Sequence, residues 1–312
     1  MAMQYIGSGQ ALDDSSPTIL SEFLATREDL GVVRNSATHK QMKPHTGVNY
    51  NIVNYNRLRA YVVAPNSPTA LSQELADNLS TYTPNEVSVK VSVAGAALRR
   101  SADAGLAKEV GYEMAIAYDR TEEQEGASQF SSFSSVVGSA GTAASPGALH
   151  AMATRLGYGN DRATPEAPPK PWYYVMHPIH QAVVAGRLVP FTDVPVGTNV
   201  YTGAANGVTV GPGRTQFGDE IIKRGVGALG MLNGAMFKTT PYIPVDSSDD
   251  CSGALFSQDG FLYISEVAYK VDPKNLERDG KEWVGWGAYA FGLYKLASYG
   301  VEGLFDATQL TA

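Results

Sequence analysis

The chain has 312 residues, with 24 Lys and Arg against 31 Asp and Glu, which gives a net charge of −7. This length suffices for one or two domains, and the acidic balance argues against a protein whose main task is to bind nucleic acid through phosphate neutralisation. The single Cys251 excludes an internal disulfide and suits a reducing cytoplasm. The sequence shows neither a signal-peptide pattern nor the run of about 18 apolar residues of a membrane-spanning helix, so we expect a soluble chain.

The first predicted element is a short helix in the segment SSPTILSEFLATREDLG. Ser16 fits the N-cap, Pro17 the first helical position and Gly31 the stop. The following residues 34–47 are polar and aperiodic, which is typical of an extended arm rather than of a core element. An arm of this length needs a surface on which to lie.

The next segment, residues 48–63, predicts a long two-stranded ribbon. Apolar and polar residues alternate in VNYNI, and a second β-rich run ends at Val63. Arg57 and Arg59 are interleaved with tyrosines, a mixture that suits single-stranded nucleic acid or protein contacts, and the acidic total favours protein. Because an isolated ribbon is only marginally stable in water, we expect support from outside this chain if the ribbon projects.

A strand and a long helix follow. The alternating run VSVKVSV, residues 87–93, predicts a strand with one buried face. Helical spacing then predicts a helix from about residue 102 to residue 124, about 30 Å long and ended by Gly126. Its apolar stripe consists of Leu106, Val110, Met114, Ala117 and Tyr118.

The predicted helix also carries like charges at neighbouring surface positions. Glu109 and Glu113, and likewise Asp119 and Glu123, are four residues apart, a spacing at which like charges oppose helix stability. We therefore expect a partner outside the helix to face these carboxylates.

The second half of the chain predicts a mixture of helices and strands. The Gly/Ser/Ala-rich segment 126–147 predicts a flexible loop and a domain boundary. The segment ALHAMATRLG predicts a helix, and WYYVMHPIHQAVVAGRL predicts a strand and a further helix that starts near Pro178. GVGALGMLNGAMFKTTPYIPV and GALFSQDGFLYISEVAYKVD predict strands, separated by the polar loop DSSDDCSG.

The Gly/aromatic stretch 283–300 has the appearance of a ligand pocket, but its spacing favours a strand. Within residues 287–293, Tyr289, Phe291 and Leu293 fall on one face, whereas the opposite face carries only alanine and glycine and is flat enough for another element to pack closely. We interpret the stretch as a packing surface and expect the removal of Tyr289 or Phe291 to lower the stability of the fold.

One pattern resembles a dinucleotide-binding motif. Gly225, Gly227 and Gly230 match G-x-G-x-x-G, but neither a clear strand before them nor a convincing helix after them supports a cofactor site. Glycines in a flexible or tightly packed strand explain the pattern better.

Two further patterns resemble metal sites. His177 and His180 form H-x-x-H without a third ligand at a suitable spacing, which favours solvated or hydrogen-bonded histidines at a helix start. Asp246, Asp249 and Asp250 cluster without the distal glutamate of an EF-hand, which favours a solvated loop. The sequence therefore predicts no catalytic residue, no metal and no cofactor.

The order of these elements resembles the major capsid proteins of tailed bacteriophages, which have the Hong Kong 97 fold. The resemblance covers nearly the whole chain and rests on element order and on the segments VSVKVSVAGAALRRS, YYVMHPIHQAVVAG and YGVEGLFDA. It implies an α+β fold with an N-terminal arm, an extended β-hairpin loop, a peripheral domain with a long spine helix, and an axial domain.

The resemblance also implies where these parts begin and end. The arm would span residues 1–45, the extended loop 46–78, the peripheral domain 79–146 with its spine helix at about 102–124, the axial domain 147–257 and the return strands 258–312.

For function, the resemblance implies a structural subunit without catalysis. The subunit would self-assemble into hexamers and pentamers of an icosahedral shell that encloses double-stranded DNA. Assembly would take place in the bacterial cytoplasm, with a separate scaffolding protein, a portal and a decoration protein as partners, and the product would be the virion. An encapsulin-type compartment of the same fold is one alternative, and a cytoplasmic nucleotide-binding α/β enzyme that uses the three glycines is another.

Contacts between subunits are part of the same expectation. Surplus carboxylates on the spine helix would face basic groups of another subunit. The candidate residues are Glu109, Glu113 and Glu123 on the helix, Arg57 and Arg59 on the extended loop, and Arg27 and Arg34 on the arm.

Overall fold

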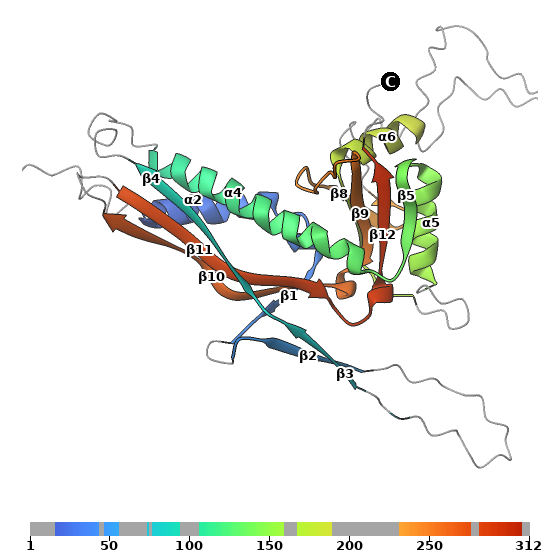
Figure 1. Ribbon diagram of the computed structural model, residues 1–312, viewed down its shortest axis with the longest axis horizontal. Coiled ribbons are helices and arrows are strands. Elements are labelled where there is room, and N and C mark those ends of the chain that lie inside the picture. The colour runs from blue at the N-terminus through green and yellow to red at the C-terminus, as the bar shows by residue number, and fades with distance from the viewer. Residues whose placement is uncertain are drawn as a thin grey trace, which may run out of the picture.

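Two sheets and a projecting ribbon form the architecture of the computed structural model (Figure 1). The structure describes residues 16–43, 47–55, 74, 77–93, 106–158, 167–188, 231–275 and 281–307. No helix in these residues is long and apolar enough to cross a membrane.

The first sheet has four strands in the order β1-β10-β11-β4. These strands are β1 (Thr38–Gln41), β10 (Phe261–Asn275), β11 (Lys281–Leu293) and β4 (Asn85–Val93). β1 is parallel to β10, and the other two pairs are antiparallel. The strand predicted from VSVKVSV is confirmed as β4, since its valines are half-buried and alternate with exposed residues.

Two helices cover one face of this sheet (Figure 1): α4 (Leu106–Ser128), with α2 (Ser16–Leu30) packed beside it. Both were predicted, but α4 continues through Gly126 instead of stopping before it. A side chain at Gly126 would meet the Val33 side chain 2.7 Å away, so this glycine permits close packing and does not end the helix. Ala117 is exposed, so the predicted apolar stripe is wrong at that position.

Aromatic rings fill the space between the helices and the sheet. Phe23 of α2 stacks on Tyr269 of β10 with ring centroids 3.5 Å apart, and Tyr118 of α4 meets both rings edge-on. Trp283 and Tyr289 of β11 are fully buried in the same core. The prediction that Tyr289 lies on a packing surface is therefore confirmed.

The second sheet has six strands in the order β5-β12-β9-β6-β8-β7. These strands are β5 (Val136–Ala143), β12 (Gly300–Asp306), β9 (Asp250–Ser257), β6 (Trp172–Met176), β8 (Ala235–Thr239) and β7 (Met231–Leu232). The predicted helices of this half are confirmed as α5 (Pro146–Gly157) and α6 (Pro178–Leu188). Ser145 caps α5 by accepting a hydrogen bond from the Ala148 amide at 3.1 Å. Leu149 and Met152 of α5 pack in a second core with Tyr174 and Phe305.

The flexible loop predicted for residues 126–147 is wrong. This segment forms the end of α4, the 3-10 helix η2 (Gln129–Ser132) and strand β5. Phe130 and Phe133 are buried and contact Phe256 of the six-stranded sheet and Phe261 of the four-stranded sheet, with ring centroids 5.8–6.2 Å apart. The two halves of the chain therefore share a packed aromatic core instead of being joined by a flexible link.

The ribbon consists of β2 (Tyr50–Tyr55) and β3 (Asp77–Tyr82), paired antiparallel. A ribbon in this region was predicted, but with a second strand ending at Val63. The strand that pairs with β2 comes later in the chain, and residues 56–63 lie outside the described residues. The ribbon projects from the four-stranded sheet on the side opposite α4 (Figure 1).

Candidate functional site

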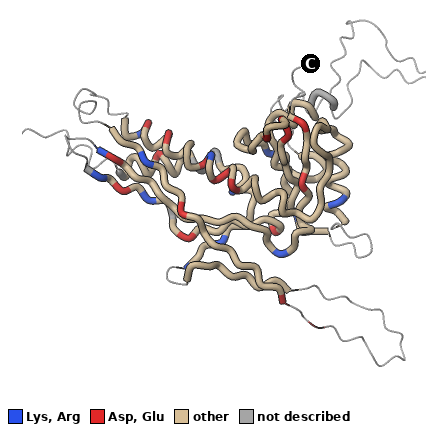
Figure 2. The backbone as a smooth tube through the Cα atoms, in the orientation of Figure 1, with Lys and Arg blue, Asp and Glu red and all other residues tan. Residues whose placement is uncertain are grey.

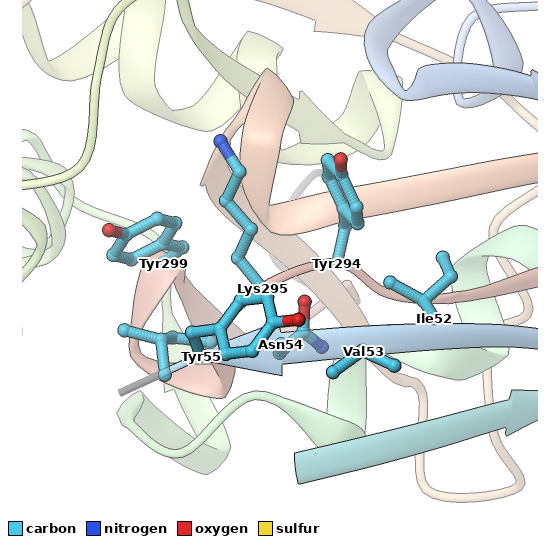
Figure 3. Close-up of a pocket in the computed structure, with 8 residues that line it drawn as sticks. Ile52, Val53, Asn54, Tyr55, Tyr294, Lys295 and Tyr299 are labelled. Carbon is cyan, nitrogen blue, oxygen red and sulfur yellow. The ribbon is translucent and has the colours of Figure 1, made fainter. Parts of the chain in front are cut away.

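A groove lies between the ribbon and the residues that follow β11 (Figure 3). Its volume is about 280 Å³. The residues that line it are Ile52, Val53, Asn54 and Tyr55 from the ribbon and Tyr294, Lys295, Leu296 and Tyr299 from the segment after β11. Tyrosines and aliphatic side chains dominate the lining, a composition found where proteins bind other proteins.

The ribbon is held to the sheet by its inner face. Tyr82 donates a hydrogen bond from its hydroxyl to the Leu293 carbonyl, and burial raises the pKa of this tyrosine. Its ring occupies the space that a side chain at Gly292 would need. Ile52 packs with Tyr82 against Ala290 of β11 in a small third core. The flat face predicted for the Ala/Gly side of β11 is therefore confirmed, and the ribbon is what packs on it.

The outer face of the ribbon is exposed and carries three large apolar or aromatic side chains among polar ones. Val53 and Leu79 lie directly opposite each other on the two strands, and their exposed fractions are 44% and 59%. Tyr55, two residues further along β2, is 59% exposed. Among the described residues of this chain, none covers these three side chains, so they are available to another surface.

Among the described residues that line the groove, Lys295 is the only charged one, and it forms an ion pair with Asp259. None of the described lining residues is a histidine, a cysteine or a carboxylate. A lining of tyrosine and aliphatic side chains can bind a protein surface.

A second notable cluster lies on α4, where Asp119, Glu122 and Glu123 are all fully buried. Glu122 forms an ion pair with Arg34 at 3.2 Å. Glu123 accepts a hydrogen bond from the Val33 amide at 2.7 Å. Burial, and next the charge of Asp119, raise the pKa of Glu123 to about 8. The carboxylates expected on an outer helix face are thus part of the interior at this point.

The seven predicted contact residues therefore fall into three groups. Arg34 and Glu123 have buried partners in the same chain, which sequence spacing did not indicate. Glu109 and Glu113 are exposed on α4, where Figure 2 shows a row of acidic residues along the helix. Arg57, Arg59 and the Arg27 side chain lie outside the described residues. Contacts with a second subunit stay a prediction for all seven.

The H-x-x-H pattern has a structural explanation. His180 is fully buried, and its Nε2 lies 3.2 Å from the sulfur of Cys251 on β9. Burial lowers the pKa of His180 to about 4 and raises that of Cys251 to about 12, so both groups are neutral near pH 7. His177 accepts the Ile179 amide at 3.2 Å at the start of α6. Of the predicted solvated or hydrogen-bonded histidines at a helix start, His177 is confirmed as hydrogen-bonded, whereas His180 is buried in the interior.

Two candidate motifs remain, the acidic cluster before β9 and the glycine motif. Asp246 accepts hydrogen bonds from the amides of Ser248 and Asp250, which shapes a turn before β9. No group of three potential metal ligands occurs in the described parts of the chain. Gly225, Gly227 and Gly230 lie outside the described residues.

Comparison with known proteins finds similarity in structure alone. No family model matches the chain, and no curated protein matches its sequence. A structure of Mycobacterium phage Che8 is 14% identical, with a TM-score of 0.59 over 89% of this chain and 92% of that one. The mature capsid of bacteriophage PhiM1 is 10% identical, with a TM-score of 0.57 over 88% and 87%. A virus-like particle from Pyrococcus furiosus is 12% identical, with a TM-score of 0.54 over 91% and 97%.

These similarities identify the fold. The chain has a mixed helix and sheet fold that matches the subunits of phage capsids over most of its length. The predicted resemblance to the major capsid proteins of tailed phages is confirmed at this level.

Proposed function

We propose that this chain, which has the fold of phage capsid subunits, is the major capsid protein of a tailed phage and builds a closed icosahedral shell of hexamers and pentamers around double-stranded DNA. The observation that carries the proposal is the large share of this chain that the solved structures match. The three solved structures named above each match 88% or more of this chain, so both sheets and their helices are included. A shared local motif would not give this result.

The division of the chain follows from this proposal. The proposed parts are the arm at residues 1–45, the extended loop at 46–78, the peripheral domain at 79–146 with α4 as the spine helix, the axial domain at 147–257 and the return strands at 258–312. Within the proposed arm, α2 and β1 pack on the core and the sheet of this chain instead of extending away from it. The boundary between residues 78 and 79 falls inside β3 (Asp77–Tyr82), so the ribbon itself ends at Tyr82. The six-stranded sheet supports the proposed axial domain. Its strands β6, β7, β8 and β9 lie within residues 147–257, and β5 and β12, which lie outside this range, complete the sheet.

The exposed face of the ribbon supports assembly from identical subunits. Val53, Tyr55 and Leu79 form an apolar surface on an element that projects from the body (Figure 1). Burying such a surface on a neighbouring subunit is favourable, at roughly 25 cal/mol per Å² of apolar area. The ribbon is therefore the element that we assign to contacts between subunits.

The partners in this proposal follow from the role of a shell. The DNA on the inner surface is bound weakly and without sequence specificity, which suits a chain with a net charge of −7. A scaffolding protein, a portal and a decoration protein complete the set, and the mature location is the virion. No catalysis is part of the proposed role.

Assembly in solution tests the proposal. The chain is expressed alone and together with a candidate scaffolding protein, and light scattering and negative-stain microscopy follow particle formation. Closed particles of uniform size are expected. Monomers or small oligomers under every assembly condition would overturn the proposal, and particles filled with an enzyme cargo instead of DNA would favour the encapsulin-type compartment.

A further inference from the structure

Residues 31–36 lie where three elements meet. They follow α2, include the 3-10 helix η1 (Arg34–Ser36) and contact both α4 and β8. The Val33 amide donates to Glu123 of α4 at 2.7 Å, and Lys238 of β8 donates to the Ser36 hydroxyl at 3.0 Å. This short segment therefore joins the spine helix to the six-stranded sheet.

The α4 side of this junction consists of acids in the interior. Asp119, Glu122 and Glu123 occupy slightly more than one helical turn, and all three are fully buried. The charged and titratable groups around Glu123 are Asp119 and Glu122 on α4, Arg34 on η1, Lys238 on β8, and Tyr242 in the turn after β8 with Arg120 beside it. Arg34 pairs with Glu122, whereas Glu123 lies near both the like charge of Asp119 and the ammonium group of Lys238. Hydrogen bonds from the Val33 and Arg34 amides and from Thr240 favour its ionised form, but burial and Asp119 outweigh them.

The protonated form of Glu123 fits this site better than the ionised form. A protonated carboxyl can accept the Val33 amide through Oε1 without placing a second negative charge beside Asp119. Ionisation places that charge in a region without solvent, where like charges repel strongly. The raised pKa of Glu123 agrees with this geometry.

We propose that Glu123 is a proton-controlled latch that holds residues 31–36 in place between α4 and β8. The protonated carboxyl keeps the junction closed, and loss of its proton loosens the segment from the helix. The inference concerns the single chain, so it does not depend on the proposed shell. In a shell, the same latch would make the attachment of the N-terminal segment depend on pH.

The sign of the effect follows from proton linkage. The closed junction binds a proton that the open one releases, because the pKa of Glu123 is raised from 4.5 to about 8 when the junction is closed. The closed form is therefore favoured at acid pH and loses its advantage as pH rises between these two values. Linkage for one group gives a change of up to about tenfold in the opening equilibrium per pH unit in this window, and no further change above it.

Hydrogen exchange of the amides in residues 31–41 measures the opening. The unassembled full chain and its Glu123→Gln variant are compared at pH 5.5 and at pH 8.5, because comparison at one pH cancels the intrinsic exchange rate. Glutamine keeps the acceptor for the Val33 amide and cannot ionise. We expect similar exchange at pH 5.5 and at least about tenfold faster exchange of the wild type at pH 8.5.

The control is Glu113→Gln, which removes an exposed carboxylate from the same helix. Its amides should exchange as fast as those of the wild type at both pH values.

The proposal is overturned if the exchange rates of the wild type and Glu123→Gln differ by the same factor at both pH values. If Glu123→Gln does not fold, Asp119→Asn replaces it, and the wild type should then open more than this variant at pH 7. Equal opening of the two would also overturn the proposal.

Discussion

At the residue scale, we expect the burial of His180 to make stability depend on pH. Burial lowers the pKa of His180 to about 4, so the unfolded chain binds a proton between about pH 6.5 and 4 that the folded chain refuses. Stability should therefore fall as pH decreases through this window, by at most about 3 kcal/mol for this group.

Urea unfolding at pH 7 and pH 4.5 measures this loss. His180→Gln should lose less stability between the two pH values than the wild type, even if it is less stable at pH 7. The control His150→Gln changes an exposed histidine on α5 and should keep the wild-type dependence. Equal losses of stability in the wild type and His180→Gln would contradict the prediction that the burial of His180 makes stability depend on pH. The raised pKa of Glu123 changes the stability in the opposite direction, because it lowers stability as pH rises. The wild type and both variants keep Glu123, so its contribution cancels when their losses of stability are compared.

Gly292 sets how closely the ribbon can approach β11. A methyl group at this position would overlap the Tyr82 ring, and moving the ring would break its hydrogen bond to the Leu293 carbonyl. We expect Gly292→Ala to destabilise the chain by about 1–3 kcal/mol in urea unfolding. Gly147→Ala is the matched control, because its nearest neighbour is the Ser145 hydroxyl oxygen at 3.8 Å. Equal stability of the two variants would contradict the close packing of the ribbon.

Residue contacts were the least predictable level. The spacing of Asp119 and Glu123 correctly identified a pair of like charges, but i,i+4 spacing gives neighbours on a helix and not the side that is buried. The pair is interior because residues 31–36 and β8 cover a second side of α4. The approach of His180 to Cys251 joins residues 71 positions apart, and no local pattern encodes it.

At the element scale, the two faces of the ribbon have different roles. Ile52 points toward the sheet and Val53 points away from it, because successive residues of a strand alternate. We expect Val53→Asp to leave the unfolding free energy within about 0.5 kcal/mol of the wild type and to reduce the yield of particles sharply. Ile52→Asp should instead lower the unfolding free energy, because it places a charge in the third core.

Sedimentation of assembled and free protein, together with urea unfolding of each variant, checks this pair. If Val53→Asp forms particles in normal yield, the outer face of the ribbon does not contact a neighbouring subunit.

Elements with a strong period were predicted well. The alternation in β4 and the capping residues of α2 identified those elements from local signals. The Gly/Ser-rich segment 126–147 was wrongly predicted to be a flexible loop, because the prediction relied on its amino-acid composition. Its signals for order were the apolar residues Phe130, Phe133 and Val137, all of which are buried. The ribbon was found, but the residues between its strands are too many for a local turn to fix the pairing.

At the scale of the whole molecule, the two sheets share one aromatic core through Phe130, Phe133, Phe256 and Phe261. Phe130→Ala removes a fully buried ring that contacts strands of both sheets. We expect a loss of about 3–5 kcal/mol and a single unfolding transition. Calorimetry would contradict the shared core if the variant unfolded in two separate steps, one of them at the wild-type temperature.

The order of elements along the chain made the fold predictable at this scale, although the identity to the solved capsid structures is only 10–14%. Hydrophobic period and turn residues survive at such identity because many residues satisfy them. Contacts between subunits do not survive in the same way, since they depend on particular side chains at a surface.

Electron cryo-microscopy of the purified assembled protein shows directly whether this chain builds a shell. We expect a closed icosahedral particle whose pentamers and hexamers each fit copies of this fold, with the Val53 and Leu79 face of every ribbon covered by a neighbouring subunit. A reconstruction in which this face is open to solvent would contradict the assigned contact, and the absence of any closed particle would contradict the claim that the chain builds a shell.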